Sequence, residues 1–61
     1  MEHEQLMDAN ETCKLLNMKR RTLYKLVREQ RIPVIIIGKM RRFSKPDVLL
    51  WLSEKKVGSK L

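Results

Sequence analysis

Apolar residues recur at helical spacing over residues 19–30, and this pattern predicts a helix with two unlike faces. Leu23, Leu26 and Val27 lie at i, i+3 and i+4 and form a stripe that must pack on a core. A different side of the same helix carries cations, an aromatic ring and a hydroxyl, from Arg20, Arg21, Thr22, Tyr24, Lys25 and Arg28. One face is therefore expected to dock on the protein while the other faces outward. A basic stripe of this kind on an isolated helix is usually only a solvated face.

A shorter helix is predicted in front of it, from about Ala9 to Leu16. Asp8 is a favourable N-cap, and Glu11 three residues later completes the spacing of a capping box. Both carboxylates also suit the positive end of the helix dipole. The predicted packing face is made of small or apolar side chains, namely Ala9, Thr12, Cys13 and Leu16. We expect a second helix to approach this face closely.

Residues 17–18 interrupt the helical pattern. Asn17 tolerates the left-handed conformation that ends a helix, and Met18 can fill the corner between two helices. The second helix is expected to begin around Lys19 or Arg20. Two short helices joined by a turn of about three or four residues form a helix-turn-helix.

Strand-forming residues follow the two helices. Pro33 is expected to end the second helix, because proline restricts the residue before it and lacks a backbone donor. Residues 34–37 are all β-branched and favour a strand. Gly38-Lys39 predicts a hairpin turn of type II′ or a related type, followed by a second strand over residues 40–44. Alternation along that strand directs Phe43 to the core.

The predicted hairpin is basic close to its tip. Lys39 lies in the turn, and Arg41 and Arg42 follow in the second strand. A basic hairpin beside a basic helix has the shape of a wing that contacts a polyanion. The alternative is a hairpin with solvated edge charges, which deter pairing with other strands.

A last helix is predicted to begin after Ser44. Ser44 is a favourable N-cap, Pro46 is tolerated in the first turn, and Asp47 lies at capping-box spacing. The predicted core face consists of Val48, Trp51 and Leu52. Leu49 and Leu50 widen the apolar arc beyond what one face can bury. At least one of them is expected to be exposed, either without consequence or as a contact with a partner or a second copy.

The two ends of the chain are expected to be loosely held. Residues 1–7 are predicted to be a partly frayed lead-in, and residues 57–61 are predicted to fray. The chain of 61 residues is interpreted as one domain, 1–61, with an ordered core over about 6–56. The predicted fold is mainly α with a small β-hairpin, a winged helix-turn-helix. A domain this small buries only about 60% of its unfolded surface, which favours binding through a surface over an enzyme cleft.

Charge is unevenly distributed along the chain. The net charge is +7, from 14 Lys and Arg against 7 Asp and Glu. No Lys or Arg occurs before Lys14, whereas Glu29 is the only acid between Lys19 and Lys45. The basic middle indicates a polyanionic partner, with nucleic acid first and an anionic membrane second. No apolar run approaches the roughly 18 to 20 residues of a spanning helix, and the acidic start is unlike a signal peptide.

Motifs of catalysis and metal binding are absent from the sequence. It contains no glycine-rich phosphate motif, no metal-ligand cluster, and no set of nucleophile, base and orienting group. Cys13 is the single cysteine and is expected to be a small buried core residue. His3 is expected to be solvated. We therefore expect a protein that is not an enzyme, holds no metal or cofactor, and resides in the cytoplasm, associated with the nucleoid.

In their order, these features resemble the excisionase-type DNA-binding domain, a small winged helix-turn-helix related to the MerR regulators and to AlpA-like phage regulators. The resemblance covers about Leu6 to Leu52. It is carried by Cys13–Leu16 with Asn17-Met18, then Arg21–Leu26, Ile32-Pro33, Ile37-Gly38, Arg42-Phe43, Asp47-Val48 and Trp51-Leu52. The ordered set is more specific for the fold than for the biological role.

Three positions depart from the family pattern. Asn17 stands where the family often has Gly at the turn between the helices, although Asn can serve there. Lys19 stands where the family often has a Ser N-cap, which weakens the cap and adds a phosphate-seeking charge. Gln30 stands where the family often has Gly after the recognition helix, so the exit of that helix is affected.

The resemblance implies sequence-specific binding of double-stranded DNA. It places the helix from Arg20 in the major groove and the Gly38-Lys39 wing on the backbone or minor groove. Base and phosphate contacts are expected from Arg20, Arg21, Thr22, Lys25 and Arg28. Backbone contacts that set the register are expected from Lys19, Lys39, Arg41 and Arg42. Tyr24 either gives its hydroxyl to a phosphate or packs between helix and wing.

The resemblance further implies a role as an excisionase-type accessory factor of site-specific recombination. The partners would then be DNA, a recombinase (integrase) and further copies of the chain on DNA. A small transcription regulator of a phage or mobile element is the nearest alternative. A protein-interaction module that uses Leu49, Leu50 and the C-terminal tail is a more distant one.

Overall fold

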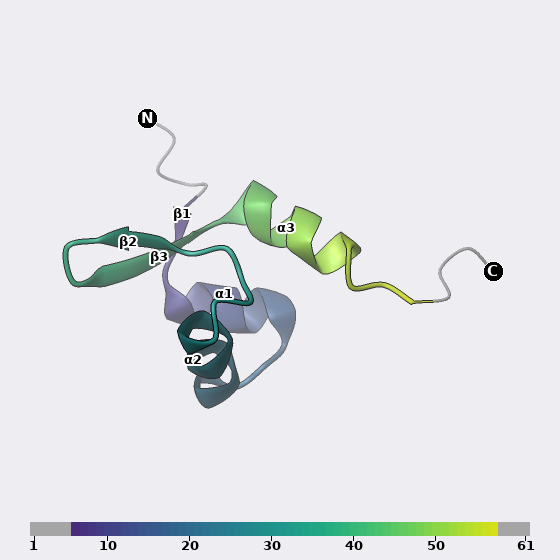
Figure 1. Cartoon of the computed structure of the whole chain (residues 1–61), viewed down its shortest axis with the longest axis horizontal. Coiled ribbons are helices and arrows are strands. Elements are labelled where there is room, and N and C mark those ends of the chain that lie inside the picture. Colours follow the sequence, from purple (N-terminus) through teal and green to yellow (C-terminus); the bar gives the residue numbers. More distant parts are fainter. Residues whose placement is uncertain (1–5, 58–61) are drawn as a thin grey trace.

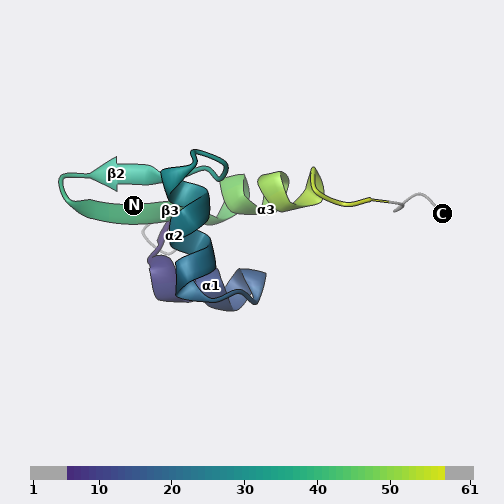
Figure 2. The ribbon, with the colours of Figure 1, turned by 60° about the horizontal axis from the view of Figure 1, so that its bottom comes forward.

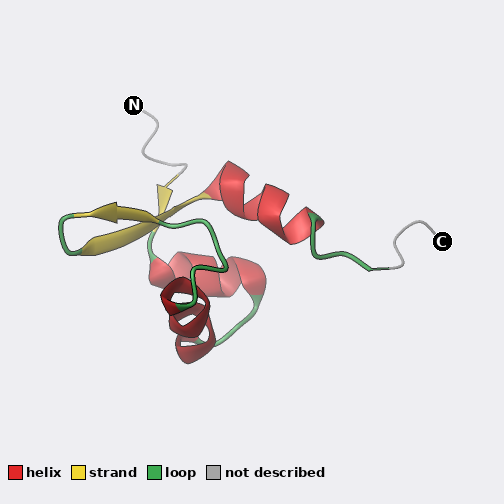
Figure 3. Ribbon diagram, viewed as in Figure 1, coloured by secondary structure: helices red, strands yellow, loops and turns green. Residues whose placement is uncertain are grey.

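The computed structural model describes residues 6–57, which form three helices and a three-stranded antiparallel sheet (Figures 1 and 3). The elements are β1 (Leu6–Met7), α1 (Ala9–Leu16), α2 (Arg20–Arg28), β2 (Ile35–Ile37), β3 (Met40–Ser44) and α3 (Lys45–Ser53). The sheet order is β1-β3-β2. This is the predicted winged helix-turn-helix, with α1 and α2 below the sheet and the β2–β3 hairpin and α3 extending to opposite sides (Figures 1 and 2).

The first helix begins and ends as predicted. The Asp8 carboxylate accepts a hydrogen bond from the Glu11 N–H at 2.8 Å, and Glu11 Oε1 accepts one from the Asp8 N–H at 3.0 Å, which completes the capping box. At the other end, Asn17 adopts φ 54° and closes the helix in the left-handed conformation. The buried face of α1 includes Thr12 and Cys13, as expected.

The second helix ends earlier than the sequence predicted. Pro33 was expected to stop it, but α2 ends at Arg28. Gln30 adopts φ 57°, its N–H donates to Val27 O, and the Arg31 N–H donates to Leu26 O. These two bonds form a Schellman motif, with Gln30 in the position that usually holds Gly. These bonds satisfy the carbonyls of Leu26 and Val27 in the last turn, so the helix ends before it reaches Pro33.

The last two residues of the lead-in form a strand that the sequence did not predict. Leu6 pairs with Ser44 and Met7 pairs with Phe43, so β1 adds a third strand to the hairpin. Met7 is buried and belongs to the core. A strand of two residues has too little periodicity to be recognised in sequence, and it forms here because β3 offers an unpaired edge. Residues 1–5 of the lead-in lie outside the described residues.

The hairpin has the predicted register and turn. Ile37 pairs with Met40, so Gly38 and Lys39 form a two-residue loop. Gly38 has φ 61° and Lys39 does not have a positive φ, as a type II′ turn requires. The strand begins at Ile35, one residue later than expected. The hairpin projects from the rest of the fold (Figure 2), and the side chains of β2 are therefore all exposed.

The core lies where α1, α2, β3 and α3 meet. Its fully buried side chains are Thr12, Leu23, Phe43 and Val48, so the expected inward direction of Phe43 is confirmed. They are joined by Met7, Cys13 and Ile32. This core fixes the positions of α2 and of β3, which carry most of the predicted binding residues.

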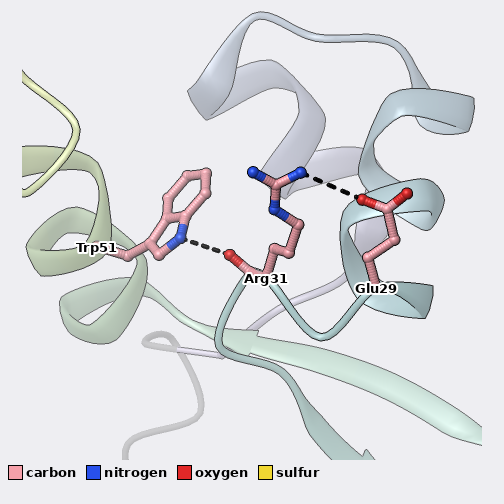
Figure 4. Close-up of polar contacts among 3 residues, drawn as sticks. All are labelled: Glu29, Arg31 and Trp51. Atoms are coloured by element: carbon pink, nitrogen blue, oxygen red, sulfur yellow. Dashed lines mark hydrogen bonds and ion pairs between the residues drawn. The ribbon is translucent and has the colours of Figure 1, made fainter.

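The last helix differs from the prediction in two respects. Ser44 occupies the N-cap position, but its side chain makes no capping hydrogen bond. Leu52 was expected on the core face and is 41% exposed, because Val48 and Trp51 make up the docked side. Trp51 holds α3 to the loop after α2, since its Nε1–H donates to Arg31 O at 2.7 Å (Figure 4). Of the tail expected to fray, only Val57 is described, and it is 94% exposed.

Candidate nucleic-acid interface

The outward side of α2 carries three cations. Arg21, Lys25 and Arg28 are exposed and lie at i, i+4 and i+7, on the side of the helix opposite the fully buried Leu23. We call these three residues the crest of α2. Within residues 6–57 the only ion pair joins Arg31 to Glu29 at 3.4 Å (Figure 4), so no described acid neutralises the crest. The crest is therefore a row of cations that is open to a polyanion.

Arg20 is engaged within the protein, unlike the crest. Its Nη1 donates to Asn10 Oδ1 of α1 at 3.1 Å, and its Nη2 donates to the Tyr24 hydroxyl oxygen at 2.8 Å. The bond to Tyr24 is the main cause that raises the pKa of Arg20 above its ordinary value. Arg20 remains a cation and also ties the start of α2 to α1.

Tyr24 lies between α2 and the wing. The guanidinium carbon of Arg20 is 5.5 Å from the centroid of its ring, and that of Arg41 on β3 is 5.8 Å away. Both distances fall within the range of cation–π attraction. The ring of Tyr24 therefore packs between α2 and the wing, which is one of the two roles expected from the sequence. Its hydroxyl accepts a hydrogen bond from Arg20.

A groove of about 470 Å³ separates α2 from the wing. Apolar side chains of Val27, Val34 and Ile36 line it together with the cations Arg28 and Arg41. A groove lined by both apolar side chains and cations suits a sugar–phosphate strand, whose sugars are largely apolar and whose phosphates are charged. The groove connects the crest of α2 to β3.

The cations of the wing differ in exposure and in the hydrogen bonds that their side chains make. Lys39 is exposed in the turn and Arg41 is exposed on β3. Arg42 is half-buried, and its Nη1 donates to Arg41 O at 2.9 Å. The guanidinium of Arg42 is thus folded back along its own strand, whereas Lys39 projects from the tip.

The beginning of α2 has no side-chain cap. Lys19 occupies the N-cap position with extended backbone, and its side chain makes no capping bond, as its identity predicted. Thr22 is exposed in the first turn. No acidic residue lies in this turn, so the positive end of the helix dipole is left for an external anion.

Sequence reasoning missed Asn10, which holds Arg20 in place. Its contact joins residues ten positions apart on different helices, and no periodicity or cap spacing signals it. None of the described helices has the length and apolar character of a membrane span. Among residues 6–57, no group of three or more His, Cys, Asp or Glu side chains is placed to hold a metal ion.

Comparison with known proteins agrees with this geometry. The family model described as a helix-turn-helix domain matches residues 6–56. No curated protein and no solved structure gave a match.

Proposed function

The chain belongs to the helix-turn-helix domain family, and from this membership we propose that it binds double-stranded DNA in a sequence-specific manner. In this proposal α2 is the recognition helix and enters the major groove, while the wing contacts the backbone or the minor groove. The major groove admits an α-helix and displays a distinct pattern for each base pair. The family membership supports DNA binding, and the readout of sequence is our inference.

The observation that carries the proposal is the unneutralised crest on a helix whose other face is buried. Arg21, Lys25 and Arg28 project from a helix that is fixed by Leu23 in the core. Arg and Lys pair with the O6 and N7 atoms of guanine, and also with phosphates. We assign base contacts to the crest and to Thr22.

The remaining predicted residues receive backbone roles. Lys19, Lys39, Arg41 and Arg42 are proposed to contact phosphates and set the register. Arg20 and Tyr24 are proposed to contact phosphate from the side of α2 that faces the wing, in addition to their contacts within the protein. About five to eight phosphate contacts would make log Kd depend on log salt with a slope of roughly 5 to 7.

We further propose that the biological role is that of an excisionase-type accessory factor, which binds close to an attachment site and assists a recombinase. The exposed cations of α2 and of the wing support this role, because an accessory factor of this kind acts through the DNA that it binds. A small transcription regulator of a phage or mobile element would use the same surface at a promoter. Mapping the bound sites in a host genome separates the two, since the first role requires sites at recombination junctions.

The experiment that tests sequence-specific binding is selection from a random duplex pool, with binding measured over a salt series. The wild-type chain is expected to recover a consensus. Arg21→Ala/Lys25→Ala should lose it, at a cost of about 1–3 kcal/mol for each lost base contact. Lys14→Ala/Lys56→Ala is the matched control, because it removes the same positive charge from two exposed side chains that are not among the proposed DNA contacts.

The outcomes discriminate among the functions. If both double variants weaken binding equally, the crest acts only through net charge and the proposed readout is wrong. Salt-dependent binding without a consensus would leave a non-specific binder. No binding at low salt would refute the proposal and favour a module that contacts proteins through Leu49 and Leu50.

A further inference from the structure

The groove between α2 and the wing has the size of a small-molecule site. Its volume of about 470 Å³ falls within the range of roughly 300–1,000 Å³ that is typical of ligand pockets. Tyr24, Val27 and Arg28 line it from α2, Val34 from the loop that follows, and Ile36 and Arg41 from the wing. Three separate segments of the chain therefore face one space.

The apolar side of the groove is only partly covered by the protein. Val27 and Val34 are half-buried, and Ile36 is 58% exposed. Because side chains alternate along a strand, Ile36 lies on the face of β2 that is turned toward α2, whereas Ile35 and Ile37 lie on the opposite face. An apolar body in the groove would remove Val27, Val34 and Ile36 from water, which is favourable.

The charged side of the groove is positive. Arg28 and Arg41 line it, and no Asp or Glu within residues 6–57 does so. Arg41 is held by the ring of Tyr24, whose centroid lies 5.8 Å from its guanidinium carbon. A guanidinium donates two parallel hydrogen bonds to a carboxylate, and this geometry suits arginine to that group. The complementary ligand therefore carries a carboxylate.

The apolar and charged sides together select the class of ligand. Inorganic phosphate would satisfy the arginines but leave the apolar side chains in water, and a neutral hydrocarbon would desolvate the arginines without giving them a counter-charge. A flat ring that bears one carboxylate satisfies both sides, and it can also pack against the ring of Tyr24. We propose that the groove binds a small aromatic carboxylate, and that this ligand competes with DNA for Arg28 and Arg41.

The competition follows from the residues that the two ligands share. In the proposed function Arg28 contacts a base and Arg41 contacts a phosphate, so an anion held by both arginines removes two contacts to DNA. The same anion fills the space that suits a sugar–phosphate strand. This part of the inference rests on the proposed DNA binding, whereas the ligand site itself does not. The aromatic acid would act as an effector that releases the chain from its duplex.

The first test measures ligand binding without DNA, with cinnamate as the probe and cinnamamide as its uncharged counterpart. The methyl signals of Val27, Val34 and Ile36 are followed by NMR during each titration. Cinnamate should shift them with a dissociation constant on the order of 1 mM, as expected for a ligand of this size. Cinnamamide should bind about tenfold more weakly, because it lacks the charge that the arginines recognise.

Two matched variants locate the probe in the groove. Ile36→Thr should weaken cinnamate binding about fivefold, because it removes apolar surface from the wall of the groove. Ile35→Thr is the control, since it makes the same change at the neighbouring residue, on the other face of β2. It should leave cinnamate binding unchanged.

The second test measures competition with the selected duplex at constant ionic strength. At about ten times its dissociation constant, cinnamate should lower the apparent affinity for DNA about tenfold, and cinnamamide at the same concentration should have little effect. Ile36 is not among the proposed DNA contacts. Ile36→Thr should therefore bind the duplex as the wild-type chain does, but require about fivefold more cinnamate for release.

The possible results separate the inference from the proposed function. Equal binding of cinnamate and cinnamamide, or equal effects of Ile36→Thr and Ile35→Thr, would overturn the assignment of the groove. Binding of cinnamate without loss of DNA affinity would overturn the competition. Absence of cinnamate binding in a chain that binds the duplex would overturn the inference alone. A chain that binds cinnamate in the groove but binds no duplex would overturn the proposed function and leave the ligand site intact.

Discussion

The contact between Tyr24 and Arg41 is predicted to couple α2 to the wing. The Arg41 guanidinium carbon lies 5.8 Å from the centroid of the Tyr24 ring, across the groove between α2 and β3. A cation–π contact at an exposed site contributes about 0.5–1 kcal/mol. We therefore expect a coupling free energy of this size between the two side chains, in the absence of DNA.

A double-mutant cycle measures this coupling. The unfolding free energies of the wild-type chain, Tyr24→Leu, Arg41→Ala and the double variant are obtained from urea titrations. The cycle of Tyr24→Leu with Lys39→Ala is the matched control, because Lys39 is a neighbouring wing cation without a contact to the ring. The control should give a coupling close to zero.

The same reasoning predicts how the variants bind DNA. Tyr24→Phe keeps the ring and its contact with Arg41, whereas Tyr24→Leu removes the ring. Tyr24→Leu should therefore bind the selected site about two- to fivefold more weakly than Tyr24→Phe. In a DNA footprint, Tyr24→Leu should lose protection only of the nucleotides that the wing contacts. Equal binding by the two variants, or equal coupling in the two cycles, would refute the assignment of Tyr24 as the link between helix and wing.

Two further predictions concern stability and are checked by the same urea titrations. Gln30→Gly should raise the unfolding free energy by about 1 kcal/mol, because Gln30 adopts φ 57° in the Schellman position. Gly38→Ala should lower it by a similar amount, because Gly38 adopts φ 61° in the turn. A change of the same sign in both variants would contradict this reasoning. Trp51→Phe should lower the unfolding free energy by about 0.5–1.5 kcal/mol, because it removes the donor to Arg31 O while keeping an aromatic ring at the docked edge of α3. A neutral effect of Trp51→Phe would mean that water replaces the indole N–H.

Features with a local cause were predictable from the sequence. The capping box of Asp8 and Glu11, the left-handed Asn17 and the turn at Gly38 each depend on residues that are a few positions apart. The inward position of Phe43 follows from alternation along a single strand. In each case the interacting groups and the signal occupy the same short window.

Features that depend on distant partners could not be predicted. β1 exists because β3 presents a free edge to Leu6 and Met7, which have no strand pattern of their own. The early end of α2 has a local cause that was nevertheless missed, because Gln30 takes the left-handed position that usually holds Gly. The exposure of Leu52 depends on which edge of α3 docks, and an apolar arc as wide as this one leaves that choice to tertiary packing.

The candidate interface shows the same division. The sequence predicted which residues are cationic and on which helix they lie, and that set of residues remains a proposal. It could not predict that Arg20 is held by Asn10 and Tyr24 while the crest is free, because this depends on how α1 crosses α2. A fixed Arg20 loses less conformational entropy than a free side chain when it contacts a phosphate. We infer that Arg20 sets the position of α2 against the backbone, and that the crest, whose side chains can adapt, reads the bases.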